Sequence, residues 1–146
     1  MRRTKLEKSI LFLDEDNACL SLMAESMAKH MGPPKIRIFS AGVRPGKIPP
    51  EVRRVLQEIG VEQSANTTKS IDQVPTNDID LVVSFGDAHE KCRSLPRKAK
   101  LEKWSIPNPM RAPGESSAVL SALRHGRDEI DKRVAALFLD HWRQGS

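Results

Sequence analysis

Two short, continuous apolar runs constrain the fold of this 146-residue chain more than any other feature. They are SILFLD at residues 9–14 and IDLVVSF at residues 79–85. An apolar run without strict alternation is typical of a strand buried on both faces, as in a parallel sheet that is covered by its crossover connections. The two runs therefore predict strands of a parallel sheet.

Helical periodicity follows the first of these runs. Apolar residues recur at helical spacing from residue 20 to residue 31, and GPP at residues 32–34 ends that helix. Strands alternating with helices predict an α/β fold, and we expect one domain over residues 1–146. The other predicted elements are a strand at 35–42, a helix at 50–60, a short helix at 86–95, a strand at 100–106 and a last helix capped by Ser116 or Ser117.

The composition limits the classes of partner. No apolar run approaches the roughly 20 residues of a membrane span, so no membrane partner is expected. A net charge of +5 makes a nucleic-acid surface conceivable, but an aromatic content of 4% without tyrosine argues against base stacking, and solvated basic faces are preferred. The two cysteines, Cys19 and Cys92, form no disulfide framework, which predicts a cytoplasmic location.

The first strand ends at three carboxylates, Asp14, Glu15 and Asp16, and the first helix follows. Ligands of open parallel sheets bind beyond the carboxyl ends of the strands, so this loop is the candidate site. A strand–loop–helix of this layout binds anions through backbone N–H groups at the helix N-terminus. The three acids would repel an anion, however, so the purpose of the loop needs another explanation.

Residues 11–25, LFLDEDNACLSLMAE, resemble the N-terminal signature of the low-molecular-weight protein tyrosine phosphatases and the thioredoxin-coupled arsenate reductases. That signature is an apolar strand, then Cys-x-x-Asn-x-x-Arg-Ser, then Met-Ala-Glu. The resemblance implies a phosphotyrosine phosphatase I-like fold: a doubly wound, four-stranded parallel sheet in the order 2-1-3-4, with helices on both faces. Further matches follow in order: FSAG at 39–42, PPEVRRVLQEIGV at 49–61, TKSI at 68–71, DIDLVVSFGDAHEKC at 78–92 and WSIPNP at 104–109.

The resemblance also assigns roles that this sequence does not fill. In the family a loop cysteine attacks the phosphate or arsenate, an arginine clamps it and an aspartate protonates the leaving oxygen. Asp14 stands at the nucleophile position, Leu20 at the arginine position and Asn108 at the general-acid position. In the reductase branch Phe85 replaces one redox cysteine, whereas Cys92 matches another. The rest of the binding loop is Glu15, Asp16, Asn17, Ala18, Cys19 and Ser21.

The joint loss of these groups predicts a pseudoenzyme of this family. It would lack phosphatase and reductase chemistry, need no cofactor, and act in binding or regulation with a protein or small ligand that the sequence does not identify. Two other functions stay open. One is a metal-dependent phosphatase or phosphoryl-transfer enzyme with Asp14 as nucleophile; the other is a nucleic-acid- or protein-binding module that uses a basic surface.

Three roles are open for Asp14. It could accept hydrogen bonds from the loop amides as an internal ligand. It could join Asp16 or Glu15 in binding Mg²⁺ or Ca²⁺. It could also form an aspartyl-phosphate, because LFLDEDNA resembles the first motif of the haloacid-dehalogenase phosphatases, although these need a later acidic motif for which Asp87 is the lone candidate.

The remaining polar residues of the region have structural interpretations. We expect Asn17 and Ser21 to hydrogen-bond within the loop and Cys19 to be a small buried hydrophobe. Asp87 would cap the short helix that follows the central strand. The histidines have no metal-like spacing and are expected on the surface: His30, His89, His125 and His141.

Overall fold

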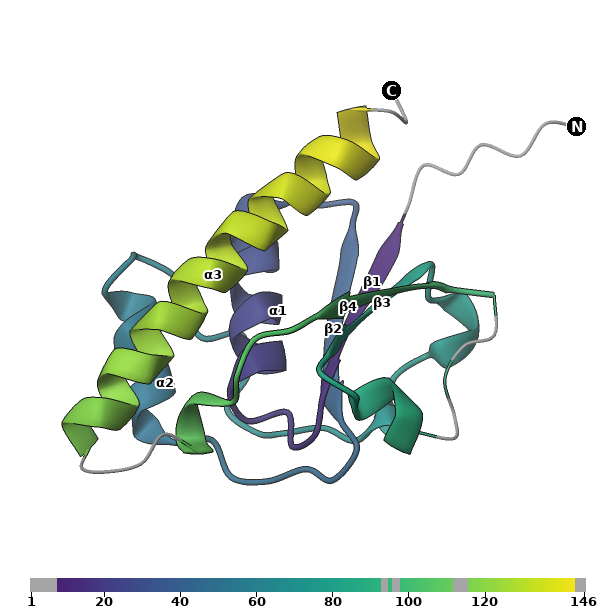
Figure 1. The fold of residues 1–146 in the computed structure, drawn as a ribbon. Coiled ribbons are helices and arrows are strands. Elements are labelled where there is room, and N and C mark those ends of the chain that lie inside the picture. The colour runs from purple at the N-terminus through teal and green to yellow at the C-terminus, as the bar shows by residue number, and fades with distance from the viewer. Residues whose placement is uncertain (1–7, 93–94, 96–97, 112–115, 144–146) are drawn as a thin grey trace, which may run out of the picture.

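A computed structural model describes residues 8–92, 95, 98–111 and 116–143 of the chain. Four strands form one parallel sheet in the order β2-β1-β3-β4, so the predicted topology is confirmed (Figure 1). The strands are β1 (Ser9–Asp14), β2 (Arg37–Gly42), β3 (Leu81–Phe85) and β4 (Lys100–Trp104). The α-helices are α1 (Leu20–Met31), α2 (Pro50–Gln57) and α3 (Ser116–Arg143).

The sequence of the central strand β1 does not alternate between apolar and polar residues, because both faces of the strand are covered. Ile10 and Phe12 pack into the core beneath the three α-helices, whereas Leu11 and Leu13 pack into a second core on the opposite face. All four side chains are at most 1% exposed. Apolar residues are therefore needed at every position, as in other doubly covered parallel strands.

The two covering layers differ in kind. α1, α2 and α3 lie on one face of the sheet, and short helices lie on the other (Figure 1). Helices thus cover both faces as predicted, but the second layer consists of 3-10 turns and loops. These turns are η1 (Ile71–Gln73), η2 (Thr76–Asp78) and η3 (Ala88–Lys91), and η4 (Pro109–Arg111) lies in the connection between β4 and α3.

The strand register brings three connections to one edge of the sheet. Leu13 of β1 pairs with Ser84 of β3, and Phe85 pairs with Trp104 of β4, so the strands end side by side. The loop before α1, the turn after β3 and the segment after β4 therefore converge there. In the described part of the chain, no helix has the length and apolar character needed to cross a membrane.

Candidate functional site

The loop between β1 and α1 has a fixed backbone shape. Asn17 has a φ of 57°, in the left-handed region that asparagine tolerates better than most residues. The loop also lies directly against the end of β2. A Cβ atom on Gly42 would lie 2.6 Å from the carbonyl carbon of Asp16 and 2.7 Å from the nitrogen of Asn17. Only glycine permits this approach.

The side chain of Asp14 turns into this loop and is held there by three hydrogen bonds. The backbone N–H of Asn17 donates to Oδ1 at 2.6 Å, and the Ser21 hydroxyl donates to the same oxygen at 2.8 Å. The backbone N–H of Ser21 donates to Oδ2 at 3.0 Å. Of the three roles left open above, this geometry is the one expected of an internal acceptor.

Burial changes the acidity of Asp14. The residue is 6% exposed, and desolvation raises its pKa from 3.8 to about 6. The hydrogen bonds from Ser21 and Asn17 oppose this rise, and the neighbouring charge of Asp16 adds to it. The carboxyl group is therefore mainly ionised at neutral pH, but its pKa lies much closer to neutral pH than that of an exposed aspartate.

A buried polar network extends from Asp14 along one face of α1 to Glu25. The Asn17 amide donates through Nδ2 to the hydroxyls of Ser21 and Ser40, both at 2.9 Å. Ser40 in turn donates to Oε1 of Glu25 at 2.9 Å. Glu25 is 2% exposed, and Lys69 approaches it to 3.8 Å. The predicted role of Asn17 and Ser21 in holding the loop agrees with these contacts.

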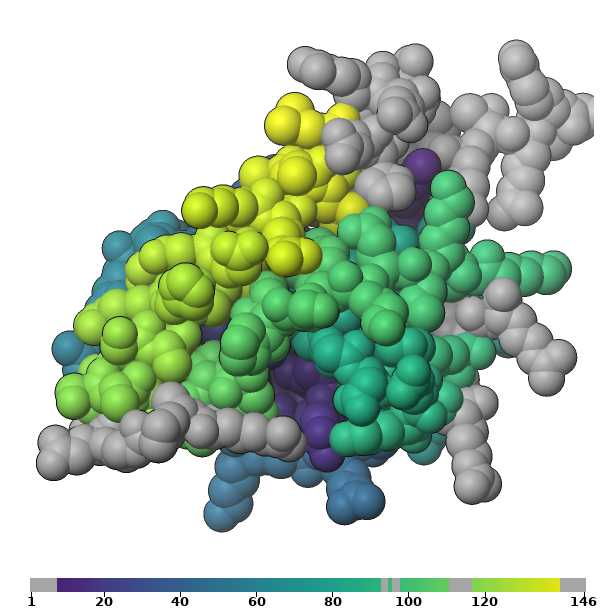
Figure 2. All heavy atoms as spheres, viewed as in Figure 1, coloured from purple at the N-terminus to yellow at the C-terminus, as the bar shows by residue number. Residues whose placement is uncertain are grey.

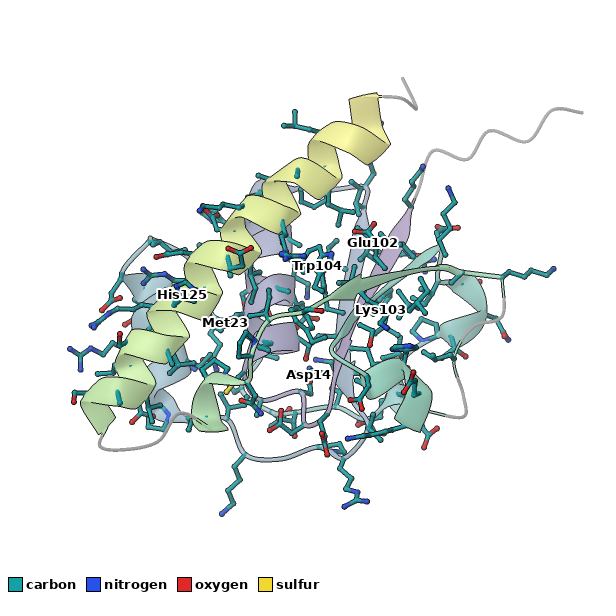
Figure 3. The ribbon with its side chains drawn as sticks, viewed as in Figure 1. Asp14, Met23, Glu102, Lys103, Trp104 and His125 are labelled. Atoms are coloured by element: carbon teal, nitrogen blue, oxygen red, sulfur yellow. The ribbon has the colours of Figure 1, made fainter. Side chains whose placement is uncertain are left out.

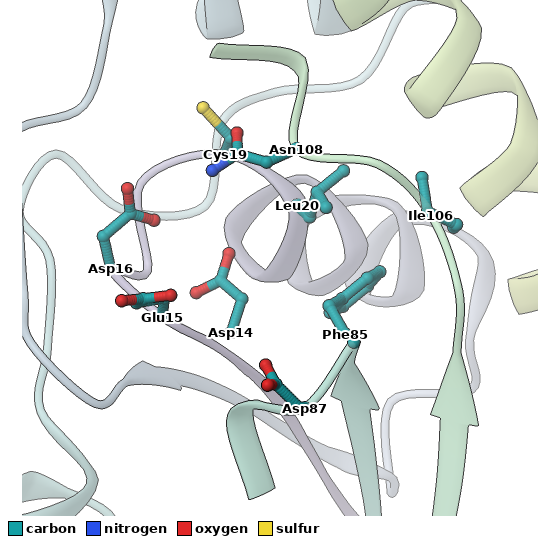
Figure 4. A pocket seen from close by; sticks show the side chains of 10 residues that line it. Asp14, Glu15, Asp16, Cys19, Leu20, Phe85, Asp87, Ile106 and Asn108 are labelled. Atoms are coloured by element: carbon teal, nitrogen blue, oxygen red, sulfur yellow. The ribbon is translucent and has the colours of Figure 1, made fainter. Parts of the chain in front are cut away.

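A cavity of about 160 Å³ opens beside Asp14. Figure 2 shows a hollow there, with loop residues at its floor. Carboxylates and apolar side chains occupy different sides of the cavity (Figure 4). Its lining residues are Asp14, Glu15, Asp16, Cys19, Leu20, Phe85, Gly86, Asp87, Ile106 and Asn108.

The fold gathers most of the predicted site residues here. Leu20 is 4% exposed and belongs to the core, so it offers no charge. Asn108 reaches the cavity from the segment after β4, and its Oδ1 accepts a hydrogen bond from the Met110 N–H at 3.0 Å. Ala18 is buried at 2% exposure without lining the cavity.

The two cysteines have different surroundings. Cys19 lines the cavity but is buried, and desolvation together with Asp16 and Asp14 raises the pKa of its thiol far above the usual range. Cys92 is half-buried and packs against the core on the opposite face of the sheet. It does not line the cavity.

The acidic residues do not form a metal cluster. Within the described residues, no three His, Cys, Asp or Glu side chains gather in a way that could hold a metal ion. Oδ1 of Asp16 accepts a hydrogen bond from the Ala18 N–H at 3.1 Å. Both candidate ligands, Asp14 and Asp16, thus already bind loop amides.

Two predictions about neighbouring residues were wrong. Asp87 makes no capping hydrogen bond to η3 and instead lies 3.9 Å from the ammonium group of Lys91. His89 is not a surface residue: its side chain is 13% exposed, and Nδ1 lies 3.0 Å from the Ser84 hydroxyl. His30 and His125 are exposed as expected, and Figure 3 labels His125 on α3. The cap of α3 and the side chain of His141 lie outside what the structure describes.

Sequence reasoning missed Ser40, Glu25 and Lys69 as parts of the site. The signal for Ser40 and Gly42 was the FSAG match, since that segment ends β2 against the loop. The signal for Glu25 was a charged residue on the apolar side of α1. Only the fold shows that these residues meet.

Comparison with known proteins places this geometry in context. Residues 9–144 match the family described as low molecular weight phosphotyrosine protein phosphatase. The arsenate reductase of Bacillus subtilis is 35% identical over 128 residues, which cover 87% of this chain and 92% of the relative. The solved structure described as an arsenate reductase in the phosphate binding state has a TM-score of 0.74 at 27% identity and covers 91% of this chain and 98% of its own. The structure of the YwlE arginine phosphatase from Geobacillus stearothermophilus has a TM-score of 0.72, and the match covers 92% of this chain and 97% of that one. At 21% identity, this likeness supports only the assignment of the fold.

Proposed function

The chain belongs to the low molecular weight phosphotyrosine protein phosphatase family, and from this premise we propose that it has lost the family's thiol chemistry and acts by binding. The observation that carries the proposal is the carboxylate of Asp14 at the nucleophile position. Its oxygens accept hydrogen bonds from Asn17 and Ser21, so the loop is complete without a substrate anion.

Phosphatase chemistry lacks three groups in this site. A carboxylate among other carboxylates repels a dianion instead of attacking it. Leu20 supplies no planar cation to clamp the transferring group. Asn108 has an amide where a proton donor is needed, and an amide does not titrate in the physiological range. Each substitution removes a different contribution to phosphoryl transfer.

Reductase chemistry lacks its thiols. Reduction of arsenate takes two electrons, and thiols supply them by forming a disulfide. Of the two cysteines, Cys19 is buried with a raised pKa and Cys92 lies away from the cavity. Phe85, at another redox position, offers none. By the resemblance, this chain therefore lacks the groups that carry the electrons in an active reductase.

Turnover assays test the proposal. The parent, Asp14→Ala and the triple variant Asp14→Cys/Leu20→Arg/Asn108→Asp are assayed with para-nitrophenyl phosphate without metal, and with arsenate, thioredoxin and thioredoxin reductase. We expect the parent to stay at background in both assays and the triple variant to gain phosphatase turnover. Parent turnover that disappears in Asp14→Ala would show that the chain is an enzyme.

A second function keeps Asp14 as a nucleophile with a divalent cation. It is favoured by one observation: Asp14 lines the cavity and is mainly ionised at neutral pH. It predicts activity that appears with Mg²⁺ and disappears with EDTA. The third function, a basic surface, predicts salt-sensitive retention on DNA. A cytoplasmic location remains part of the proposal, motivated by the two free cysteines.

A further inference from the structure

We propose that this site binds a protein segment in which a basic side chain is followed or preceded by an apolar one, with the basic group in the acidic cavity and the apolar group in an adjoining groove. The inference rests on the proposed function, because it names the class of partner for a chain that binds instead of catalysing. The apolar group would lie in a groove beside the cavity.

The groove lies between the segment after β4 and the first half of α3. It has a volume of about 780 Å³, within the range of ligand sites that bury most of an organic group. Ala118 and Ala122 of α3, spaced by four residues, have small side chains that leave room above the helix, whereas Gly126 packs against the far wall. A Cβ atom on Gly126 would lie 3.6 Å from Pro109, so the far wall is close to this helix face. The full lining is Ile106, Pro107, Asn108, Pro109, Ala118, Ser121, Ala122, His125 and Gly126.

The groove continues into the cavity beside Asp14. Ile106 and Asn108 line both spaces, so a single ligand that crosses these two residues reaches both. Leu20 lies 3.5 Å from the Cβ position of Gly126, so the helix packs against the cavity wall there, and a ligand would pass from one space to the other over Ile106 and Asn108. The two spaces therefore adjoin at Ile106 and Asn108, with an apolar part in the groove and an acidic part in the cavity.

Charge complementarity selects the occupant of the acidic part. Asp14 has used three of its roughly four acceptor positions on the loop, which leaves capacity for one further donor. Asp16 adds a second carboxylate on the same side of the cavity, and Glu15 and Asp87 stand at the rim, where Lys91 contacts both. A guanidinium or ammonium group fits these acceptors, whereas a phosphate does not.

The pairing of the two parts favours a protein segment over a nucleic acid or an isolated cation. A nucleic acid would bring phosphates to a carboxylate-lined cavity. A simple cation would leave the apolar groove empty. Two neighbouring side chains on one backbone supply both chemistries at once, and the half-buried Asn108 at the boundary has an amide NH2 group that can donate to that backbone.

Fluorescence polarisation with synthetic peptides tests this assignment. The probes are fluorescein-labelled nonapeptides of glycine and serine that contain one leucine and one arginine, separated by zero, one or two residues in either order. Matched probes replace the arginine by citrulline, which keeps the shape without the charge, or the leucine by serine. We expect at least one spacing to bind at micromolar concentration, and each replacement to weaken binding about tenfold or more, with further weakening at 0.5 M salt.

Variants of the protein locate the binding. Asp16→Asn removes a charge and keeps the oxygen that accepts the Ala18 N–H, so it should weaken the arginine probe and leave the citrulline probe unchanged. Ala122→Phe fills the groove without touching the acidic part. Ala136→Phe, at an exposed site on the same helix outside the groove, is the control for added bulk. Circular dichroism and thermal unfolding establish that each variant is folded.

Binding of the arginine–leucine probe that both Asp16→Asn and Ala122→Phe weaken, and Ala136→Phe does not, supports the proposal. Equal affinity for the citrulline probe, tighter binding of a phosphotyrosine peptide or of single-stranded DNA, or no binding at 1 mM peptide overturns it. Absence of turnover together with absence of peptide binding would remove only this inference. Turnover by the parent would remove the proposed function, whatever the peptides show.

Discussion

The buried carboxyl group of Asp14 should make the protein less stable at neutral pH than at pH 4. Because its pKa rises from 3.8 to about 6 on folding, the folded state binds a proton more tightly than the unfolded state. The stabilisation by that proton is fully present below the unfolded pKa and is lost as the pH rises through the folded one. At about 1.4 kcal/mol per tenfold change in proton affinity, the complete loss is about 3 kcal/mol, and about 2 kcal/mol of it falls between pH 4 and pH 7.

Asp14→Asn isolates this contribution, since asparagine keeps the shape of the side chain and does not titrate. The free energy of unfolding is measured by urea denaturation of the parent and the variant at pH 4, 5, 6 and 7. The difference, parent minus variant, should fall by about 2 kcal/mol over this range. A constant offset from the new amide cancels in the comparison. Asp131→Asn, on an exposed position of α3, corrects for the loss of one negative charge.

The reasoning fails if the difference between the parent and Asp14→Asn stays constant to within about 0.5 kcal/mol. The carboxyl group would then titrate as in the unfolded chain, and the loop would not desolvate it. A difference that rises with pH would indicate that the hydrogen bonds from Ser21 and Asn17 outweigh burial and hold the pKa of Asp14 below its unfolded value. The first result would weaken the proposal that Asp14 is a buried internal acceptor, whereas the second would keep the acceptor role and contradict the role of burial.

Two further substitutions probe the framework of the site. Asn17→Ala should reduce the free energy of unfolding by about 3 kcal/mol in urea denaturation, because it leaves the Lys69 N–H without its acceptor and removes the buried donor to the hydroxyls of Ser21 and Ser40. Arg127→Ala should lower it by about 2–3 kcal/mol, since the guanidinium group, 8% exposed, bonds the Val55 carbonyl oxygen and Glu58 and so joins α3 to α2. Arg124→Ala breaks a more exposed ion pair with the same glutamate and should change the thermal midpoint far less, which makes it the matched control.

The elements with strong local patterns could be predicted from the sequence. The predicted bounds of β1 and α1 agree with the observed ones. A continuous apolar run fits few structures other than a buried strand, and an apolar helical stripe that stops at Gly32 fixes the end of the helix. The predicted helix at 50–60 is shorter in the structure. α2 ends at Gln57, and Ile59 and Gly60 make tight bonds to carbonyls three residues back. Such tightening depends on how the end of the helix packs.

The opposite layer of the sheet could not be predicted in the same way. It is built from η1, η2 and η3, and few apolar residues, among them Ile71, Val74 and Ile79, anchor it to the second core. Three-residue turns carry too few residues to show a period. The strand predicted at 100–106 ends at Trp104 for a related reason: the Ile106 N–H turns back to the Trp104 carbonyl oxygen, which no propensity encodes.

The polar network explains how the loop keeps its shape when the residue at position 14 differs from that of the family. The Asn17 amide donates one hydrogen bond to Ser21 and one to Ser40. Each serine hydroxyl in turn donates a hydrogen bond to a carboxylate, Ser21 to Asp14 and Ser40 to Glu25. These hydrogen bonds all point away from Asn17, so they require an acceptor at position 14 and another at position 25. The acceptor at position 14 does not have to be a carboxylate. By the resemblance, a thiolate would stand at position 14 in active relatives, and a thiolate also accepts hydrogen bonds from N–H and O–H groups. A carboxylate can therefore replace a thiolate at position 14 without a change in the shape of the loop. The same replacement puts a weak nucleophile in the place of a strong one. The proposed loss of chemistry and the retained shape of the loop would thus follow from the same substitution.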